Sequence, residues 1–455
     1  MCNLSLGLKP RKRASGIHIP DDQGQVTPIT QTYEVQTRDK ALLVVCDPRD
    51  DYEADANAEE LRLLVDSAGL EIVDEMHVRR EHPDPRFYIG SGNADEVFLR
   101  VQDSEADVVI VGEDLSPSQQ RNLSKIATVE IVDRTQLILN IFAQRAHTSE
   151  GKLQVELAQL QYLLPRLSGR GTTMSRIGGS GGGLATRGPG ETKLETDRRK
   201  VRDQIASIKD ELDDVIKQRD VQRQSRKKLR VPSASLVGYT SAGKSTLLNL
   251  IAGSDVEAHA RLFATLDPTV RRVDLEGHCS ILLSDTVGFL RHLPHGLIAA
   301  FRATLQEIVE ADFLIHVVDA SHHFFKQQFE SVLEVLAELG AEEKPIITVF
   351  NKSDLIKDQY ELRQLVAFTP DSCYMSAKTG EGLHYLEDLI CKVVERMMNH
   401  IELMLPYDRG DLLALCHDRG RVLEQDYRPE GVYLHVELTP ELAGRLAQYK
   451  AGPKE

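Results

Sequence analysis

The sequence predicts an α/β fold divided into several domains, and three observations lead to this prediction. Short apolar runs alternate with helix-length segments from residue 41 to 132, as in a parallel sheet with crossover helices. A glycine-containing loop at 238–245 lies between another apolar run and a second helix-like segment. Two long segments with helical periodicity flank a glycine-rich stretch at 169–190. At 455 residues the chain is long enough for about three domains.

The first part of the chain is expected to hold a mobile arm and a small domain. Residues 1–38 are polar and aperiodic, whereas residues 39–134 alternate between strand and helix patterns and predict a parallel-sheet α/β domain. Strands are expected at 42–46, 70–78, 108–111 and 129–132, and helices at 56–68, 93–103 and 117–127. The turn at 88–92 lacks the third glycine and the lysine of a nucleotide loop, so we interpret it as structural. A second nucleotide site there, giving ATPase activity, is the alternative.

Residues 135–229 are predicted to form an antiparallel helical hairpin. One helix should cover 135–164, with a possible break near Gly151, and another should cover 194–218. Apolar residues in the second helix repeat in heptads and need a partner, which the leucines of the first helix can provide. The heptad positions are Leu194, Val201, Ile205, Ile208, Leu212 and Val215, facing Leu153, Leu157, Leu160 and Leu164.

The tip of this hairpin, at 169–190, has nine glycines and three arginines. A flexible linker is one interpretation. Arginines spaced along the loop favour contact with RNA instead, because bare backbone amides and guanidinium groups follow a phosphate contour. Residues 151–230 carry 18 Lys and Arg against 10 Asp and Glu, in a chain whose net charge is −15. The expected RNA contacts are Arg170, Arg176, Arg187, Arg198 and Arg199.

Residues 238–245 fit the phosphate-loop pattern G-x-x-x-x-G-K-S/T between a buried strand at 234–237 and a helix at 246–251. Glycines let backbone amides turn inward, where they and the helix N-terminus hold an anion. Lys244 would reach the β- and γ-phosphates, and the Ser245 hydroxyl would bind Mg²⁺. The loop alone predicts nucleotide binding.

Three further motifs specify the nucleotide. Asp285–Gly288 is a D-x-x-G after a strand at 279–284, placed to hold Mg²⁺ through water and to offer an amide to the γ-phosphate. The strand at 345–350 ends in the N-K-x-D of Asn351–Asp354, and a short strand at 372–375 ends in Ser376–Lys378. Asp354 can accept two hydrogen bonds from guanine, which adenine cannot donate. Residues 230–400 are therefore predicted to be a Ras-like GTPase domain with GTP and GDP as substrate and product.

A switch loop should supply one more Mg²⁺ ligand. Residues 262–269 resemble the Phe-x-Thr-Leu-x-Pro switch of Obg-related GTPases, which aligns Thr265 with their metal-binding threonine and leaves Thr269 as the alternative. We expect Lys244, Thr265, Asp285 and Gly288 to act in catalysis, and Ser245 and Thr265 to bind the metal. The expected nucleotide contacts are Gly238, Tyr239, Thr240, Ser241, Ala242, Gly243, Lys244, Ser245, Phe263, Ala264, Thr265, Leu266, Asp267, Asp285, Thr286, Val287, Gly288, Asn351, Lys352, Ser353, Asp354, Ser376, Ala377 and Lys378.

Phe289 follows the D-x-x-G where many signalling GTPases have a glutamine that orients the attacking water. A phenyl ring cannot hydrogen-bond that water. Hydrolysis by the isolated protein is therefore expected to be slow and to depend on a partner.

The rest of the sequence sets the context. No stretch of about 18 apolar residues occurs and no secretory signal is evident, so a cytosolic protein is expected. Six scattered cysteines form no C-x-x-C pair and predict reduced thiols. Residues 401–455 are expected to be a small α/β subdomain with a helix at 408–417 and a strand at 431–438. His417 and His435 lie outside any metal-ligand pattern.

Together these motifs resemble the HflX-type GTPases of the Obg/HflX group over about residues 40–455. The resemblance rests on Arg170–Thr172, Arg187–Thr192, Leu194–Arg199 and the four GTPase motifs. It implies a GTPase that binds the large ribosomal subunit and ribosomal RNA, is a monomer off the ribosome, and splits stalled or stressed ribosomes. An assembly or anti-association factor gated by GTP is the alternative. Ser241 stands where many relatives carry an asparagine that helps to hold potassium, so potassium activation does not follow from the resemblance.

Overall fold

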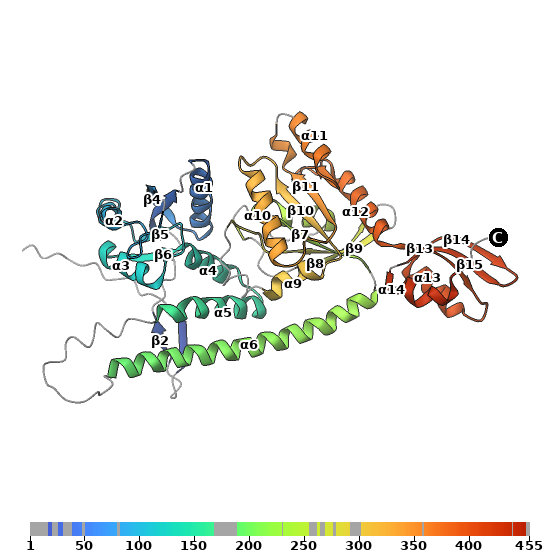
Figure 1. Ribbon diagram of the computed structural model, residues 1–455, viewed down its shortest axis with the longest axis horizontal. Helices are drawn as coiled ribbons and strands as arrows, with labels where there is room; N and C mark the ends of the chain where they lie inside the picture. Colours follow the sequence, from blue (N-terminus) through green and yellow to red (C-terminus); the bar gives the residue numbers. More distant parts are fainter. Residues whose placement is uncertain are drawn as a thin grey trace, which may run out of the picture. The chain divides into compact units, whose positions relative to one another are not determined.

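The computed structural model describes most of the chain, and its contacts divide it into two units, Met1–Glu211 and Leu212–Glu455. Each unit is described by itself (Figure 1). The described residues are 17–20, 26–30, 39–47, 51–79, 82–167, 189–229, 231–253, 262–263, 269–275, 279–291, 302–356, 359–438 and 440–451.

The first unit contains a four-stranded parallel sheet in the order β4-β3-β5-β6. Helices α2 and α3 pack on one face, and α1 and α4 lie on the other. Both faces are covered, which explains why all four residues of β5 are buried and apolar. The elements are β3 (Lys40–Asp47), α1 (Asp51–Ser67), β4 (Glu71–Arg79), α2 (Ser91–Ser104), β5 (Val108–Val111), α3 (Pro117–Ala127), β6 (Glu130–Asp133) and α4 (Arg134–Arg145).

Local signals account for the boundaries of these elements, and the predicted parallel-sheet domain is confirmed. Ser116 begins α3 with a capping box, since its hydroxyl accepts from the Gln119 amide while the Gln119 side chain accepts from the Ser116 amide. In the turn before α2, the Asp84 carboxylate accepts from the amides of Arg86 and Phe87, both at 2.8 Å. Hydrogen bonds within the protein therefore hold this turn.

One feature of the first unit differs from expectation, and a possible break in a predicted helix is present. Strands β1 (Ile17–Pro20) and β2 (Val26–Thr30) pair antiparallel within the stretch expected to be aperiodic. The helix expected at 135–164 is broken between α4 and α5 (Ser149–Arg166), because Thr148 caps α5 by accepting from the Gly151 amide at 3.0 Å.

The helical hairpin pairs α5 with the first part of α6 (Pro189–Leu229), which extends beyond the predicted helix at both ends. On the predicted seam, Val201 and Leu160 are fully buried. Beside the seam, the Gln204 amide donates to the Glu156 carboxylate at 2.6 Å. The tip that would join the two helices lies outside the described residues.

Arg166, near the end of α5, joins the helix to the carboxyl edge of the sheet. Its guanidinium donates to Asp133 Oδ2 and to the Leu115 carbonyl, both at 2.8 Å, and lies over the Tyr162 ring, 3.4 Å from the ring centroid. Asp133 is fully buried. Burial raises the pKa of its carboxyl, and the charge of Arg166 opposes that shift.

The second unit is built on a six-stranded sheet in the order β12-β11-β10-β7-β9-β8, in which only β8 runs antiparallel to its neighbour. The strands are β7 (Ser233–Val237), β8 (Thr269–Leu275), β9 (Cys279–Asp285), β10 (Phe313–Asp319), β11 (Ile346–Asn351) and β12 (Ser372–Tyr374). The helices are α7 (Lys244–Ala252), α9 (Arg302–Glu310), α10 (Phe325–Glu338), the 3₁₀ turn η1 (Ser353–Leu355), α11 (Gln359–Phe368) and α12 (Leu383–Met397).

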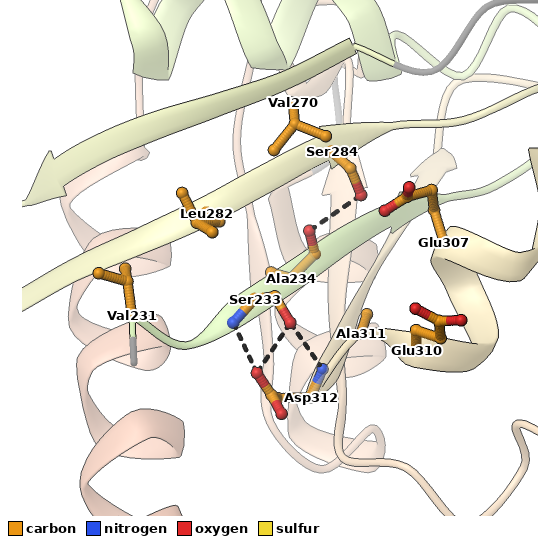
Figure 2. Close-up of a pocket in the computed structure, with 10 residues that line it drawn as sticks. All are labelled: Val231, Ser233, Ala234, Val270, Leu282, Ser284, Glu307, Glu310, Ala311 and Asp312. Atoms are coloured by element: carbon orange, nitrogen blue, oxygen red, sulfur yellow. Dashed lines mark hydrogen bonds between the residues drawn. The ribbon is translucent and has the colours of Figure 1, made fainter. Parts of the chain in front are cut away.

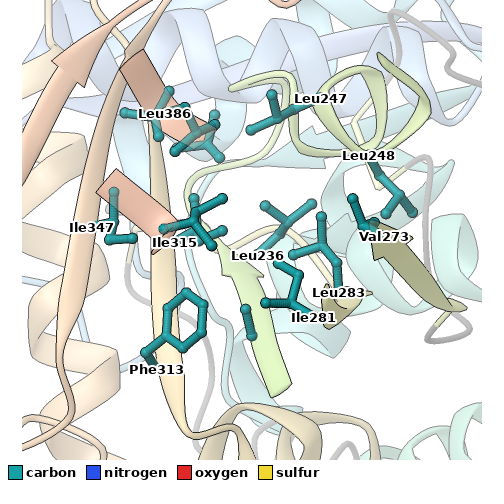
Figure 3. Packing of buried hydrophobic residues seen from close by; sticks show 14 of the residues in the cluster. Leu236, Leu247, Leu248, Val273, Ile281, Leu283, Phe313, Ile315, Ile347 and Leu386 are labelled. Atoms are coloured by element: carbon teal, nitrogen blue, oxygen red, sulfur yellow. The ribbon is translucent and has the colours of Figure 1, made fainter. Parts of the chain in front are cut away.

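The core of this domain lies between the sheet and helices α7 and α12 (Figure 3). Leu236, Ile315 and Ile347 project from three adjacent parallel strands and meet Leu247 of α7 and Leu386 of α12. All five side chains are fully buried, and each contributes roughly 1.5–3 kcal/mol to folding. Packing of this kind fixes the strand ends, from which the loops of the site emerge.

The C-terminal part forms a three-stranded antiparallel sheet, β13-β15-β14, with its own apolar cluster. The elements are β13 (Asn399–Leu405), α13 (Gly410–Arg419), β14 (Arg421–Arg428), β15 (Gly431–Leu438), α14 (Pro440–Leu446) and η2 (Ala447–Tyr449). His417 is exposed and hydrogen-bonds Gln425 at 2.8 Å. Among the described residues, no cysteine forms a disulfide, and no helix is long and apolar enough to cross a membrane.

We predict that Arg166→Ala destabilises the first unit in a pH-dependent way. Removing one partner of a buried ion pair costs about 3–5 kcal/mol because the other charge is left uncompensated. Folding raises the pKa of Asp133, so protonation relieves the penalty as pH falls. Relative to the wild type, amide hydrogen exchange of β5 and β6 should therefore be much faster at pH 7.5. The increase over the wild type should be smaller at pH 5.

Arg396→Ala is the control, because Arg396 pairs with Asp371 at the surface and exposed pairs contribute only about 0–1 kcal/mol. Equal destabilisation by Arg166→Ala at both pH values would contradict the assigned role of Asp133.

Candidate nucleotide site

The phosphate loop, residues 238–245, connects β7 to α7 at the carboxyl edge of the sheet. Gly238 has a φ of +151°, and a Cβ atom there would lie 2.2 Å from the Val317 carbonyl oxygen. Gly243 has a φ of +97°, and its Cβ would lie 2.3 Å from the Asn351 side-chain nitrogen. Only glycine fits either position. Ser241 is exposed and has a φ of 63°.

Lys244 is buried beneath this loop. Its ammonium donates to the carbonyl oxygens of Gly238 at 3.0 Å and Tyr239 at 2.8 Å. Burial lowers the pKa of Lys244 to about 8, although the charge of Asp285 acts in the opposite direction. A buried cation with a depressed pKa gains from an anion beside it, so the loop favours a phosphate ligand.

Asp285 lies at the end of β9 and faces the start of α7. The Ser245 hydroxyl donates to Asp285 Oδ2 at 2.6 Å, while Oδ1 accepts from the Thr286 amide at 3.0 Å. The Thr286 hydroxyl donates to the Leu236 carbonyl at 2.6 Å and so fixes the D-x-x-G segment to β7. The structure therefore brings Ser245 and Asp285 together.

The segment after Asp285 pairs directly with the phosphate loop. Phe289 donates its amide to the Gly238 carbonyl at 3.1 Å and accepts from the Thr240 amide at 2.9 Å. The Tyr239 hydroxyl accepts from the Arg291 amide at 3.0 Å. Phe289 itself is 2% exposed, so its ring packs as part of the fold.

Gly288 has no space for a side chain. A Cβ atom there would lie 2.7 Å from Thr240 Cγ2 and 3.1 Å from Lys244 Nζ. The phosphate loop and the D-x-x-G are therefore in van der Waals contact.

Asn351 links the two halves of the site. Its side-chain nitrogen donates to the Ala242 carbonyl at 2.7 Å, and its side-chain oxygen accepts from the Ala377 amide at 2.9 Å. The side chain is 2% exposed, and both of its polar atoms are satisfied. It holds the phosphate loop and the loop after β12 in fixed register.

The remaining residues of the N-K-x-D and S-A-K motifs surround this link. Lys352 has a φ of 63°, and the Ser353 amide donates to the Met375 carbonyl at 3.1 Å. Asp354 and Lys378 are exposed, whereas Ser376 is fully buried. Asp354 thus lies at the surface of the edge at which open α/β sheets bind ligands.

Part of the expected switch cannot be placed. Ala264, Thr265, Leu266 and Asp267 lie outside the described residues. Phe263 is buried with a φ of 57°, and the alternative ligand Thr269 begins β8 directly opposite Asp285 in the ladder.

Among the expected RNA contacts, Arg170, Arg176 and Arg187 also lie outside the described residues. Arg198 and Arg199 lie on α6, with Arg199 exposed.

Two residues near the site were missed by sequence reasoning. Asp319 ends β10 and pairs with Lys352. The signal in the sequence that could have identified it is an apolar run that ends in a carboxylate residue. His316 is 1% exposed, stacks on Phe329 at 4.9 Å, and has no hydrogen-bond partner for Nδ1 in the described part of the chain. Burial and the charge of Lys244 lower its pKa to about 3, so it is neutral.

A separate pocket lies at the opposite edge of the sheet (Figure 2). Asp312 accepts there from the Ser233 amide at 2.7 Å and its hydroxyl at 2.8 Å. Glu310 accepts from Gln306 at 2.6 Å. The pocket lies at the start of β7, away from the phosphate loop, and its carboxylates have partners within the protein.

A phosphate loop, a D-x-x-G and an N-K-x-D gathered at one edge of a mostly parallel sheet define a P-loop GTPase. Residues 233–352 match the model of a family described as 50S ribosome-binding GTPase, and residues 55–143 and 145–226 match those of the N-terminal and middle regions of a GTP-binding GTPase. The chain belongs to the HflX family of GTPases, and it hydrolyses GTP.

Two GTPases named HflX support this assignment. GTPase HflX of Lacrimispora saccharolytica is 42% identical, over 93% of this chain and 98% of its own length. GTPase HflX of Escherichia coli is 45% identical, over 82% of this chain and 87% of its own. Among solved structures, a GTP-binding protein from Sulfolobus solfataricus in complex with GDP is 25% identical, over 79% of this chain and 99% of its own, with a TM-score of 0.42.

We predict that Lys244→Met abolishes GDP-dependent stabilisation without destabilising the nucleotide-free protein. The pKa of Lys244 is lower folded than unfolded, so the ionised form costs stability at pH 7.5, and methionine removes that cost at similar volume. Thermal unfolding with and without GDP measures both effects. A ligand at 100 times its Kd adds about 2.7 kcal/mol to the wild type.

Lys326→Met, at an exposed position of α10, is the matched control and should keep the full response to GDP. Normal GDP stabilisation of Lys244→Met would rule out the assigned phosphate contact.

Proposed function

We propose that this GTPase binds the large ribosomal subunit and uses GTP binding and hydrolysis to split or rescue stalled or stressed ribosomes. The observation that carries the proposal is the match of residues 233–352 to a family described as 50S ribosome-binding GTPase. The basic segment at 151–230, which covers most of the helical hairpin, supports it, because RNA is bound largely through its phosphates and its shape. On this proposal the protein works in the cytoplasm and is a monomer off the ribosome.

The GTP site is proposed to work with Mg²⁺, and the donor set fits this ion. Mg²⁺ is typically bound by one or two protein oxygens together with phosphates and water. The Ser245 hydroxyl and the Asp285 carboxylate, 2.6 Å apart, are oxygen donors of this kind. Among the described residues, no cluster of three or more His, Cys, Asp or Glu side chains could hold a metal alone. Thr265, with Thr269 as the alternative, is proposed to complete the set.

Each residue then has a role in hydrolysis. Mg²⁺, when bound, neutralises charge that develops on the phosphates. The Lys244 ammonium, already fixed by two carbonyls, binds the β- and γ-phosphates. Ser245 would bind the metal and Asp285 would hold it through water, and the Gly288 amide would face the γ-phosphate. Asp354 accepts hydrogen bonds from guanine, and Asn351 keeps the base loops in register with the phosphate loop.

RNA contact is proposed for Arg170, Arg176, Arg187, Arg198 and Arg199. The position of Arg198 and Arg199 on α6, adjacent to the buried seam residue Val201, supports a rigid basic stalk. The second candidate function is an assembly or anti-association factor, which would occupy free large subunits and use hydrolysis only to leave. The same GTP site serves both functions.

Sedimentation of intact ribosomes with the protein and a non-hydrolysable GTP analogue separates the two functions. We expect dissociation into subunits, and we expect a variant with a shortened 169–190 loop to lose splitting while keeping its affinity for GTP. Binding only to free large subunits, with intact ribosomes unaffected, would favour the assembly factor.

Hydrolysis by the isolated protein should be slow and should be stimulated by large subunits. The buried Phe289 ring cannot orient the attacking water, so a partner has to close the switch or supply the polar group. Single-turnover hydrolysis, measured with and without purified large subunits, checks this. A fast rate in the absence of any partner would count against the prediction, and Lys244→Met gives the background rate.

A further inference from the structure

Asp319, at the end of β10, carries a buried carboxylate that serves the N-K-x-D segment. The residue is 8% exposed, and its Oδ2 accepts from the Lys352 ammonium at 2.5 Å. Its Oδ1 accepts from the Ser321 amide at 3.1 Å and the Ser321 hydroxyl at 2.6 Å. Both oxygens are therefore occupied, and the side chain has one orientation. A carboxylate held in this way fixes the cation paired with it.

Lys352 needs such a partner because its backbone is strained. Its φ of 63° places a long side chain in the left-handed region, which costs roughly 1–2 kcal/mol for residues other than glycine. Strain of this kind persists only where the surrounding contacts determine the conformation. The backbone on either side is held, since the Ala320 amide donates to the Asn351 carbonyl at 3.1 Å and the Ser353 amide to the Met375 carbonyl at 3.1 Å. The Asp319 ion pair fixes the side chain between them.

Asp354 lies two residues beyond Lys352, on the 3₁₀ turn η1. The side chain of Asp354 is exposed, so its direction depends on the backbone that precedes it. That backbone begins at Lys352, which has a left-handed conformation and is held by its ion pair with Asp319. Asp319 on β10 is also the register partner of Asn351 on β11, so the two strands place the ion pair and the motif side by side.

We propose that Asp319 is a positioning residue for guanine recognition. Through its ion pair with Lys352 it holds the turn that aims Asp354 at the base. The inference rests on the proposed role of Asp354 in binding guanine. It adds a specificity determinant that lies on a neighbouring strand and outside the four motifs.

The test compares the affinities of GDP and inosine diphosphate for the full-length protein. Inosine lacks the exocyclic amine of guanine, so the ratio of the two affinities reports the hydrogen bond to Asp354. In Asp319→Asn we expect GDP to bind about tenfold more weakly and the GDP preference to fall toward one, because a hydrogen bond to a charged group contributes about 1.5–3 kcal/mol. Competition against a fluorescent GDP analogue gives both affinities.

Asp312→Asn is the matched control, since Asp312 lies just before the same strand at its opposite end and bonds Ser233 (Figure 2). It should leave the ratio unchanged. Lys352→Met removes the same pair from its more exposed side and should reproduce the effect of Asp319→Asn, so the test does not depend on how well one variant folds.

Equal weakening of GDP and inosine diphosphate in Asp319→Asn and in Lys352→Met would overturn the inference and leave Asp319 a purely structural residue. Asp354→Asn distinguishes this result from failure of the site itself. If Asp354→Asn keeps the wild-type preference for GDP, the proposed guanine contact is wrong. If it loses the preference while Asp319→Asn keeps it, only the positioning role is wrong.

Discussion

The site depends on the side-chain amide of Asn351. This group is buried, donates to the phosphate loop at Ala242 and accepts from the loop after β12 at Ala377. A buried amide with both ends satisfied has one low-energy orientation, so the loops that follow β7, β11 and β12 are kept at fixed separations. Gly243 is part of the same constraint, because its missing side chain is what lets Asn351 approach. The parts expected to bind phosphate and base are thereby joined through one buried side chain.

Electrostatics adds a second constraint. The buried ammonium of Lys244 and the carboxylate of Asp285 lie in a region where every charge costs desolvation energy. Packing between the sheet and helices α7 and α12 stabilises the domain and offsets the destabilisation caused by these buried charges. Pre-organised charges need no rearrangement when a substrate binds, which is the usual basis of electrostatic catalysis.

The sequence predicted those parts of the fold and site that depend on local chemistry. The strand Val108–Val111 and the helix Pro117–Ala127 were predicted within a residue, because an apolar run and a Ser-Pro cap are local signals. The phosphate loop and the strands before the other motifs were found for the same reason. Helix α6 extends beyond the segment with the heptad repeat, because its Lys, Arg, Gln and Glu residues favour helix even where no other helix packs against it. Strands β1 and β2 were missed because each contains a proline and too few residues to show alternation.

The sequence alone could not predict which distant segments of the chain lie side by side. Nothing near Asp319 indicates that β10 lies beside β11, and nothing near Tyr239 indicates that it faces Arg291. The pairing of Phe289 with Gly238 and Thr240 has a thermodynamic consequence. Because the backbone that continues from the D-x-x-G is hydrogen-bonded to the phosphate loop, nucleotide binding and movement of that segment share a coupling free energy. By linkage, any partner that binds the GTP-bound arrangement more tightly must raise the affinity for GTP by the same factor.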